Sequence, residues 1–221
     1  MGTFPKIAES VTLEHQIAEL MAEQKRIGWP FDVRKAQELE NQLLTELERL
    51  KKQAENICHF VPHNLFTPKR DNKKQGYFAG CEMQRLKEFN PSSREHIAWW
   101  FTTFQGWKPT KLTPTGKAVI DETVLKEIGT EEALVFLKIL VIQKKLGMLS
   151  QGTNAWLKLV KDGRLHHSCF IGAVTHRMAH SQPNLAQVSS DKDCRELFIT
   201  KPTWKLIDSD LAGIELRLFA H

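Results

Sequence analysis

The chain has 221 residues, of which 41% are hydrophobic, and it carries a formal net charge of +5. This length and apolar content are enough for a buried core in one domain or two small ones. No stretch approaches the roughly 18 uncharged apolar residues of a transmembrane helix, and the N-terminus lacks the apolar block of a signal peptide. We therefore expect a chain that neither spans nor crosses a membrane.

The first half of the sequence has the periodicity of helices. One apolar face predicts a first helix, which the sequence "GWP" at 28–30 should end; the face consists of Leu13, Ile17, Leu20 and Met21. Asp32 can cap a second helix, which carries a leucine stripe. The periodicity then fails from about 59 to 87, where we expect a long loop or a small insertion.

The positive charge is concentrated around the start of this loop. Between 49 and 74 there are seven Lys or Arg side chains and two acidic ones, so this segment accounts for the whole excess. Such a stretch is typical of a loop that contacts phosphates, and a solvated surface loop is the alternative. The candidate phosphate-binding residues are Lys69, Arg70, Lys73 and Lys74.

Three further helix starts are indicated by capping residues. In "FNPSSREHIAWWF", Ser92 and Glu95 fit a capping box. Asp121 can cap a short helix and Thr130 a long one. The long helix is apolar on most sides up to Lys144, so we expect it to be buried between other elements.

After about residue 150 the pattern changes to short strands. The segment 162–180, "DGRLHHSCFIGAVTHRMAH", combines a turn dipeptide, alternating residues and a glycine, which indicates two strands. "RELF" is typical of a helical turn, "WKLIDSD" of a buried strand, and a helix should follow Gly213. The predicted class is α+β, with a helical region over 1–150 and the opening of a mixed or antiparallel sheet over 151–221.

The four cysteines are far apart and form no C-x-x-C pair; they are Cys58, Cys81, Cys169 and Cys194. We expect reduced thiols in a cytosolic protein, and neither a disulfide framework nor a zinc site. His59 and His63 lie beside Cys58 with a spacing that could suit a metal, but a second cysteine pair is missing.

Two aspartates lie at the end of the expected last strand. Asp208 and Asp210 precede a helix start, and a hard cation such as Mg²⁺ prefers carboxylate oxygens together with substrate phosphates. The helix N-terminus beside them also favours anions. The alternative is structural, because an aspartate before a helix often serves as its N-cap.

A second group of polar residues lies in "AVTHRMAHSQPNLAQV"; it contains Thr175, His176, Arg177, Asn184 and Gln187. Arg, Asn and Gln can donate to the minor-groove acceptors that every base pair presents, so such donors test pair geometry without reading sequence. The alternative is a polar turn capped by Asn184.

In combination, these segments resemble family A DNA polymerases, the DNA polymerase I superfamily, and especially its bacteriophage replicative branch. "VTHRMAHSQPNLAQ" is similar to the family's T-G-R and P-N-L-x-Q elements, and "LIDSDLAGIELRLFAH" is similar to motif A, D-x-S-x-x-E-L-R. "LMAEQKRIGWPFD", "FNPSSREHI" and "GWKPTKLTPTGKAVIDETVL" look like parts of the thumb of the phage enzymes. The resemblance implies a helical thumb over 1–150, with its basic loop, and the start of a mostly antiparallel palm over 151–221.

The resemblance also implies roles for single residues. Asp210 matches the motif A aspartate that holds both catalytic Mg²⁺ ions, and the Leu211 carbonyl would be a further ligand. Glu215 would stand at the sugar of the incoming deoxynucleotide. Arg177 and Gln187 match minor-groove donors near the primer terminus, with Asn184 in the same loop. Asp208 matches no motif position, and His176 and Ala212 depart from the family's glycine and small polar residue.

The fingers helix and motif C, which brings the second metal-binding aspartate, follow motif A in the family. Because the sequence ends at His221, the resemblance predicts a fragment or split subunit that is inactive alone and is completed by a second polypeptide. Its partners would be primer–template DNA and deoxynucleoside triphosphates, in the cytoplasm of a phage host. The basic segment is short for binding a thioredoxin-like processivity partner.

Two other functions remain open from the sequence. One is a DNA-binding module that derives from a polymerase thumb and has no catalytic activity. The other is a self-sufficient Mg²⁺-dependent phosphoryl-transfer enzyme that uses Asp208 and Asp210.

Overall fold

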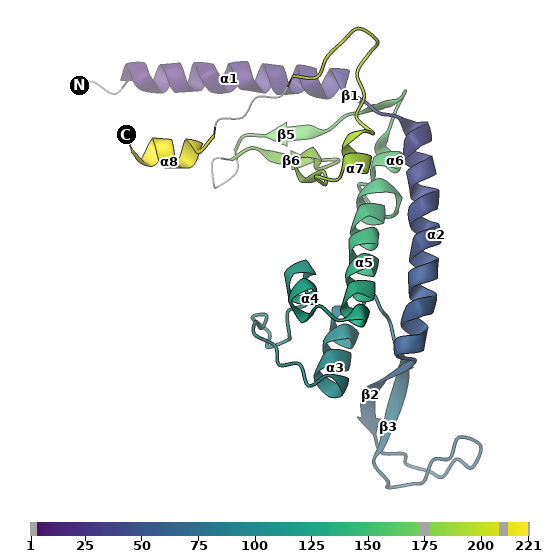
Figure 1. Cartoon of the computed structure of the whole chain (residues 1–221). Coiled ribbons are helices and arrows are strands. Elements are labelled where there is room, and N and C mark those ends of the chain that lie inside the picture. The colour runs from purple at the N-terminus through teal and green to yellow at the C-terminus, as the bar shows by residue number, and fades with distance from the viewer. Residues whose placement is uncertain (1–3, 173–176, 208–211, 221) are drawn as a thin grey trace. The chain divides into compact units, whose positions relative to one another are not determined.

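The computed structural model describes residues 4–172, 177–207 and 212–220 (Figure 1). Its contacts divide the chain into two compact units. The central unit comprises residues 38–153, and the terminal unit combines residues 1–37 with 154–221. None of the helices in the described ranges is long and apolar enough to cross a membrane.

The central unit is mainly helical. It contains most of α2 (Val33–Ile57), the hairpin strands β2 (Phe60–Phe66) and β3 (Met83–Glu88), α3 (Arg94–Phe104), α4 (Glu122–Ile128), α5 (Glu131–Leu146) and the π-helical turn η1 (Gly147–Gln151). α5 is the buried helix that the sequence predicts, because its apolar residues face the core on several sides.

An aromatic cluster forms the core of the central unit. The ring of Phe136 on α5 is fully buried, and its centroid lies 5.6 Å from that of Phe89 and 5.9 Å from those of Trp100 and Phe101 on α3. Tilted and edge-on aromatic pairs at such distances add to the free energy of burial. The cluster therefore holds α3 and α5 together.

The capping residues were predicted with one error. Asp121 and Thr130 accept the backbone N–H groups of Val124 and Ala133 and cap α4 and α5, as predicted. For α3 the prediction of Ser92 was wrong, because Ser93 is the last extended residue and accepts the N–H of His96.

Ser92 and Glu95 make other contacts instead. The hydroxyl of Ser92 accepts a hydrogen bond from the side-chain amide of Gln143 on α5. The carboxylate of Glu95 pairs with Lys117. Neither side chain therefore takes part in a capping box.

The segment from 59 to 87, for which the sequence predicts a long loop or a small insertion, contains a β-hairpin with a long connecting loop. β2 and β3 pair in antiparallel register, with an irregularity between Pro62 and Leu65 (Figure 1). The connecting loop has its own turn, in which Asn72 and Tyr77 exchange two backbone hydrogen bonds of 2.8 and 2.9 Å. The loop carries the exposed Cys81 and the basic residues.

The terminal unit is mixed. It contains α1 (Phe4–Ile27), β1 (Trp29–Pro30), α6 (Trp156–Leu159), β4 (Arg164–Leu165), β5 (Ser168–Phe170), β6 (Ala179–Ser181), the 3₁₀ turn η2 (Leu185–Gln187), α7 (Lys192–Arg195) and α8 (Ile214–Phe219). β1 pairs with β4, and β5 with β6, both antiparallel. Together with the helices of the central unit, these short antiparallel sheets confirm the predicted α+β class.

Two predicted turns position the short strands. Gly28 ends α1 with a positive φ of 67°, and a Cβ there would lie 2.7 Å from the ring of His166, so only glycine fits. Asp162 and Gly163 both have positive φ between the bridged residues Lys161 and Arg164. This is the two-residue hairpin turn that the dipeptide Asp-Gly favours.

The predicted buried strand before the last helix is not present in its described part. Trp204 to Ile207 have no regular structure and are exposed, Ile207 to 88%. A strand needs a hydrogen-bonding neighbour, and no strand in the described residues pairs with this segment. The helix predicted after Gly213 does form, as α8.

Candidate functional site

The terminal unit brings together two candidate residues that lie 38 positions apart in the sequence. The guanidinium of Arg177, just before β6, forms an ion pair and hydrogen bond with the carboxylate of Glu215 on α8. Both side chains remain accessible, with exposures of 77% and 69%. The two segments singled out in the sequence therefore meet at the protein surface.

Asn184 and Gln187 lie at the two ends of η2. The side-chain oxygen of Asn184 accepts the N–H of Ala186 at 3.1 Å and caps η2. This is the structural role that the sequence allowed as an alternative. Pro183 is buried just before the cap and anchors the turn, whereas Asn184 and Gln187 are exposed.

Four of the candidate residues lie outside the described residues; they are Thr175, His176, Asp210 and Leu211. Asp208 lies outside them as well. The expected cation ligands therefore have no described geometry, and their roles rest on the sequence.

The basic candidate residues lie in the loop between β2 and β3, and all four are exposed; they are Lys69, Arg70, Lys73 and Lys74. The loop is shaped by side-chain hydrogen bonds. Asp71 accepts the N–H of Ala79 at 2.7 Å, and Asn72 accepts that of Lys74 at 3.2 Å. Positive charge is thus presented on an ordered turn, an arrangement that can contact a phosphate backbone.

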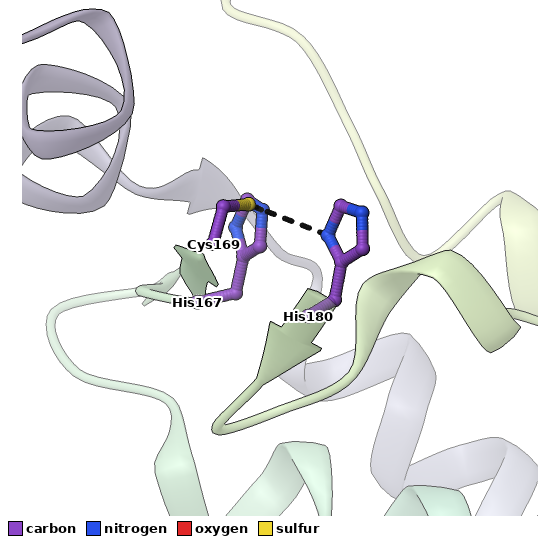
Figure 2. Close-up of side chains that lie close together, drawn as sticks. All are labelled: His167, Cys169 and His180. Carbon is purple, nitrogen blue, oxygen red and sulfur yellow. Dashed lines mark hydrogen bonds between the residues drawn. The ribbon is translucent and has the colours of Figure 1, made fainter. Parts of the chain in front are cut away.

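A cluster that the sequence analysis missed lies on the β5–β6 hairpin. The sulfur of Cys169 lies 3.1 Å from Nε2 of His167 and 3.3 Å from Nδ1 of His180 (Figure 2). The two imidazole rings stack nearly parallel, with centroids 5.8 Å apart. The spacing H-x-C followed by a histidine on the returning strand is the signal that could have indicated it.

Burial shifts the pKa values of two members of the cluster. Burial lowers the pKa of His167, with a smaller contribution from His180, and raises the pKa of Cys169.

Cys58 is the cysteine beside which the sequence shows a possible metal spacing. It donates its thiol hydrogen to the carbonyl of Phe60 at 3.3 Å.

Comparison with known proteins identifies the family. The family model for DNA polymerase family A matches residues 73–221. The chain is 32% identical to the DNA-directed DNA polymerase of Enterobacteria phage T3 and 31% identical to that of Escherichia phage T7, in each case over 96% of this chain and 39% of the phage protein.

A solved structure agrees in fold. The polymerase domain of Pol1 from M. smegmatis, solved with DNA primer–template and dNTP, superposes with a TM-score of 0.61 at 16% identity, over 94% of this chain and 33% of that one. At this identity the likeness concerns the fold alone. The family match includes both segments that meet through Arg177 and Glu215, and the chain therefore belongs to DNA polymerase family A.

Proposed function

We propose that this chain supplies part of the active site of a DNA-directed DNA polymerase that adds deoxynucleotides to a primer. The observation that carries the proposal is the contact between Arg177 and Glu215. Arg177 belongs to the segment similar to the family's primer-contacting element, and Glu215 to the segment similar to motif A. A polymerase requires these two elements to act at the same place, where the primer end meets the incoming nucleotide.

The donor groups in this region suit the substrates. Exposed Arg177, Asn184 and Gln187 can donate to minor-groove acceptors, with Thr175 and His176 in the same segment. Glu215 would border the sugar of the incoming nucleotide. The basic loop between β2 and β3 would contact DNA phosphates through Lys69, Arg70, Lys73 and Lys74.

The cation of this reaction would be held by the carboxylate of Asp210 and the carbonyl of Leu211. Oxygen donors of these two kinds suit Mg²⁺, which also binds substrate phosphates. In polymerases a metal pair stabilises the attacking and the leaving oxygen of the displacement. A single aspartate from this chain is insufficient for such a pair, so further ligands are needed.

The remaining ligands would come from residues outside these 221. The chain spans 39% of the length of the phage polymerases that it matches. We propose that the fingers and motif C, which follow motif A in the family, complete the site, and that the complete polymerase acts in the cytoplasm of an infected host cell.

Primer extension by the 221-residue chain, alone and mixed with a fragment that carries the fingers and motif C of a phage-type family A polymerase, tests the proposal. We expect no extension by the chain alone and extension by the mixture. Asp210→Ala should abolish extension in the mixture without loss of association, whereas Asp208→Ala should retain substantial activity. Loss of activity in Asp208→Ala and not in Asp210→Ala would show that the motif is misaligned. DNA binding without extension in any mixture would favour a non-catalytic DNA-binding module.

A further inference from the structure

The β5–β6 hairpin brings a cysteine and two histidines to one face of the sheet. His167 and Cys169 are two positions apart, so along an extended chain their side chains point to the same side. His180 is the direct cross-strand partner of Cys169, and directly opposed side chains lie on the same face. The convergence in Figure 2 thus follows from strand register.

From this geometry we propose that His167, Cys169 and His180 form a binding site for Zn²⁺. Their ligand atoms all lie within 4.8 Å of one another, and the two sulfur–nitrogen distances are 3.1 and 3.3 Å. In a tetrahedral zinc site, bonds of about 2.3 Å to sulfur and about 2.0 Å to nitrogen separate these ligand atoms by roughly 3.5 Å. The two sulfur–nitrogen distances are thus close to those of a zinc site, and rotation of the histidine side chains would bring their ring nitrogens, which lie within 4.8 Å of each other, into range.

The chemistry of the three groups suits Zn²⁺ better than a hard cation. Thiolate and imidazole are ligands of zinc, whereas Mg²⁺ and Ca²⁺ take oxygen. Imidazole coordinates a metal through the lone pair of a ring nitrogen, and each of the two histidines has a ring nitrogen close to the sulfur of Cys169. When the ion binds, the sulfur of Cys169 exchanges its proton for the metal, and the proton passes to solvent.

Hydrogen bonding alone satisfies the cluster incompletely. A thiol has one hydrogen, so Cys169 can donate to only one of the two rings that it contacts and can accept from the other. His167 is only 4% exposed, and its Nδ1 has no hydrogen-bond partner in the described part of the chain.

The site leaves room for a fourth ligand. His167 and His180 line a cavity of about 370 Å³ in the terminal unit, together with Gln24, Trp29 and Arg195. A water molecule in this cavity can complete a tetrahedral site made by three protein ligands. Arg177 lies three residues before His180, so a bound ion would fix the strand that follows the candidate primer contact.

The test uses the full chain, freed of metal with a chelator and then loaded with Zn²⁺ or with Co²⁺ as a spectroscopic probe. We expect one Zn²⁺ per chain after desalting, by elemental analysis, and a higher thermal midpoint with the ion than without it. The Co²⁺ form should show a thiolate-to-cobalt charge-transfer band and the strong visible absorption of tetrahedral Co²⁺.

Variants assign the ligands. Cys169→Ser should abolish the charge-transfer band, and both Cys169→Ser and His180→Gln should weaken Zn²⁺ binding more than about 100-fold, beyond the loss that outer-shell changes cause. Cys81→Ser and His63→Gln, which change an exposed cysteine and an exposed histidine elsewhere, should bind as the unmodified chain does. Circular dichroism identifies any variant that fails to fold. If a variant does not fold, the cobalt spectrum of the unmodified chain decides whether a thiolate binds the ion. Substoichiometric Zn²⁺, a cobalt spectrum without the thiolate band, or equal affinity of the folded Cys169→Ser variant would overturn the proposal.

Discussion

Replacement of Arg177 separates a structural role of its ion pair from a role in binding DNA. The pair with Glu215 is largely exposed, at 77% and 69%. Exposed ion pairs contribute only about 0.2 to 1 kcal/mol to stability, because water and salt screen them. Arg177→Ala should therefore lower the free energy of unfolding by less than about 1 kcal/mol.

Because the ion pair with Glu215 is weak, the guanidinium of Arg177 can leave it and bind DNA instead. A hydrogen bond that involves a charged group contributes roughly 1.5 to 3 kcal/mol, which exceeds the cost of leaving Glu215. Once the lost ion pair is subtracted, Arg177→Ala should weaken binding of a primer–template by about 2- to 100-fold. Glu215→Gln should have the opposite sign, since it frees Arg177 and removes a negative charge, and should strengthen binding by up to about fivefold.

Fluorescence anisotropy with a labelled primer–template, at fixed salt, measures both effects, and urea unfolding measures stability. Lys192→Ala and Glu23→Gln are matched controls, because each removes one partner of an exposed ion pair in the terminal unit. A loss of stability above about 2 kcal/mol in Arg177→Ala would exceed the contribution of any exposed ion pair and would refute the reasoning. Weaker DNA binding by Glu215→Gln would refute it as well.

Three further predictions follow from other parts of the structure. The first concerns the basic loop, whose charges are removed by Lys69→Gln, Arg70→Gln, Lys73→Gln and Lys74→Gln. In a plot of the logarithm of DNA affinity against the logarithm of salt concentration, these substitutions should flatten the slope by about 0.9 per lost phosphate contact. A loop that contacts only solvent would leave the slope unchanged. Phe136→Ala should lower the free energy of unfolding in urea by about 3 to 5 kcal/mol, because it opens a cavity among three aromatic rings. Leu134→Ala, which changes an exposed side chain on the same helix, should lower it far less. Similar losses in the two variants would contradict the assigned core. Burial, chiefly, lowers the pKa of His96 from its usual 6.5, and the neutral ring accepts the N–H of Asn90 through Nδ1 at 2.9 Å. The neutral His96 side chain therefore contributes stability above pH 6.5. This contribution is lost as the pH falls through the lower pKa of the folded state. His96→Gln should reduce that pH dependence in urea unfolding, and an unchanged dependence would contradict the assignment.

Features set by neighbouring residues could be predicted from the sequence. The caps by Asp121 and Thr130, the end of α1 at Gly28 and the Asp162–Gly163 turn each depend on a few adjacent positions. The cap of α3 was misplaced by one residue because two consecutive serines fit the same pattern, and only the backbone conformation distinguishes them.

Features that depend on distant partners could not be predicted in this way. β2 pairs with a strand about 20 residues later, and Pro62 and Asn64 interrupt the alternation that would reveal it. The apolar run from Trp204 to Ile207 fits a strand by composition but has no paired neighbour in the described residues. Composition alone does not supply the neighbour that a strand requires.

In the candidate site, too, single residues could be predicted from the sequence, but contacts between distant residues could not. The similarity of its motifs to a known family pointed to Arg177 and Glu215 one by one, whereas their contact joins positions 38 residues apart. The cluster of His167, Cys169 and His180 was missed because cross-strand register, which single spacings do not reveal, makes it.

Cys81 offers a place for a reporter on the basic hairpin. Among the four thiols it is the exposed one, whereas Cys194 is buried and Cys58 and Cys169 are half-buried, with pKa values raised by burial. The thiolate is the reactive form, so a maleimide dye should attach first at Cys81. Energy transfer from that dye to a fluorophore on the DNA would then give the distance between the hairpin and the duplex in solution.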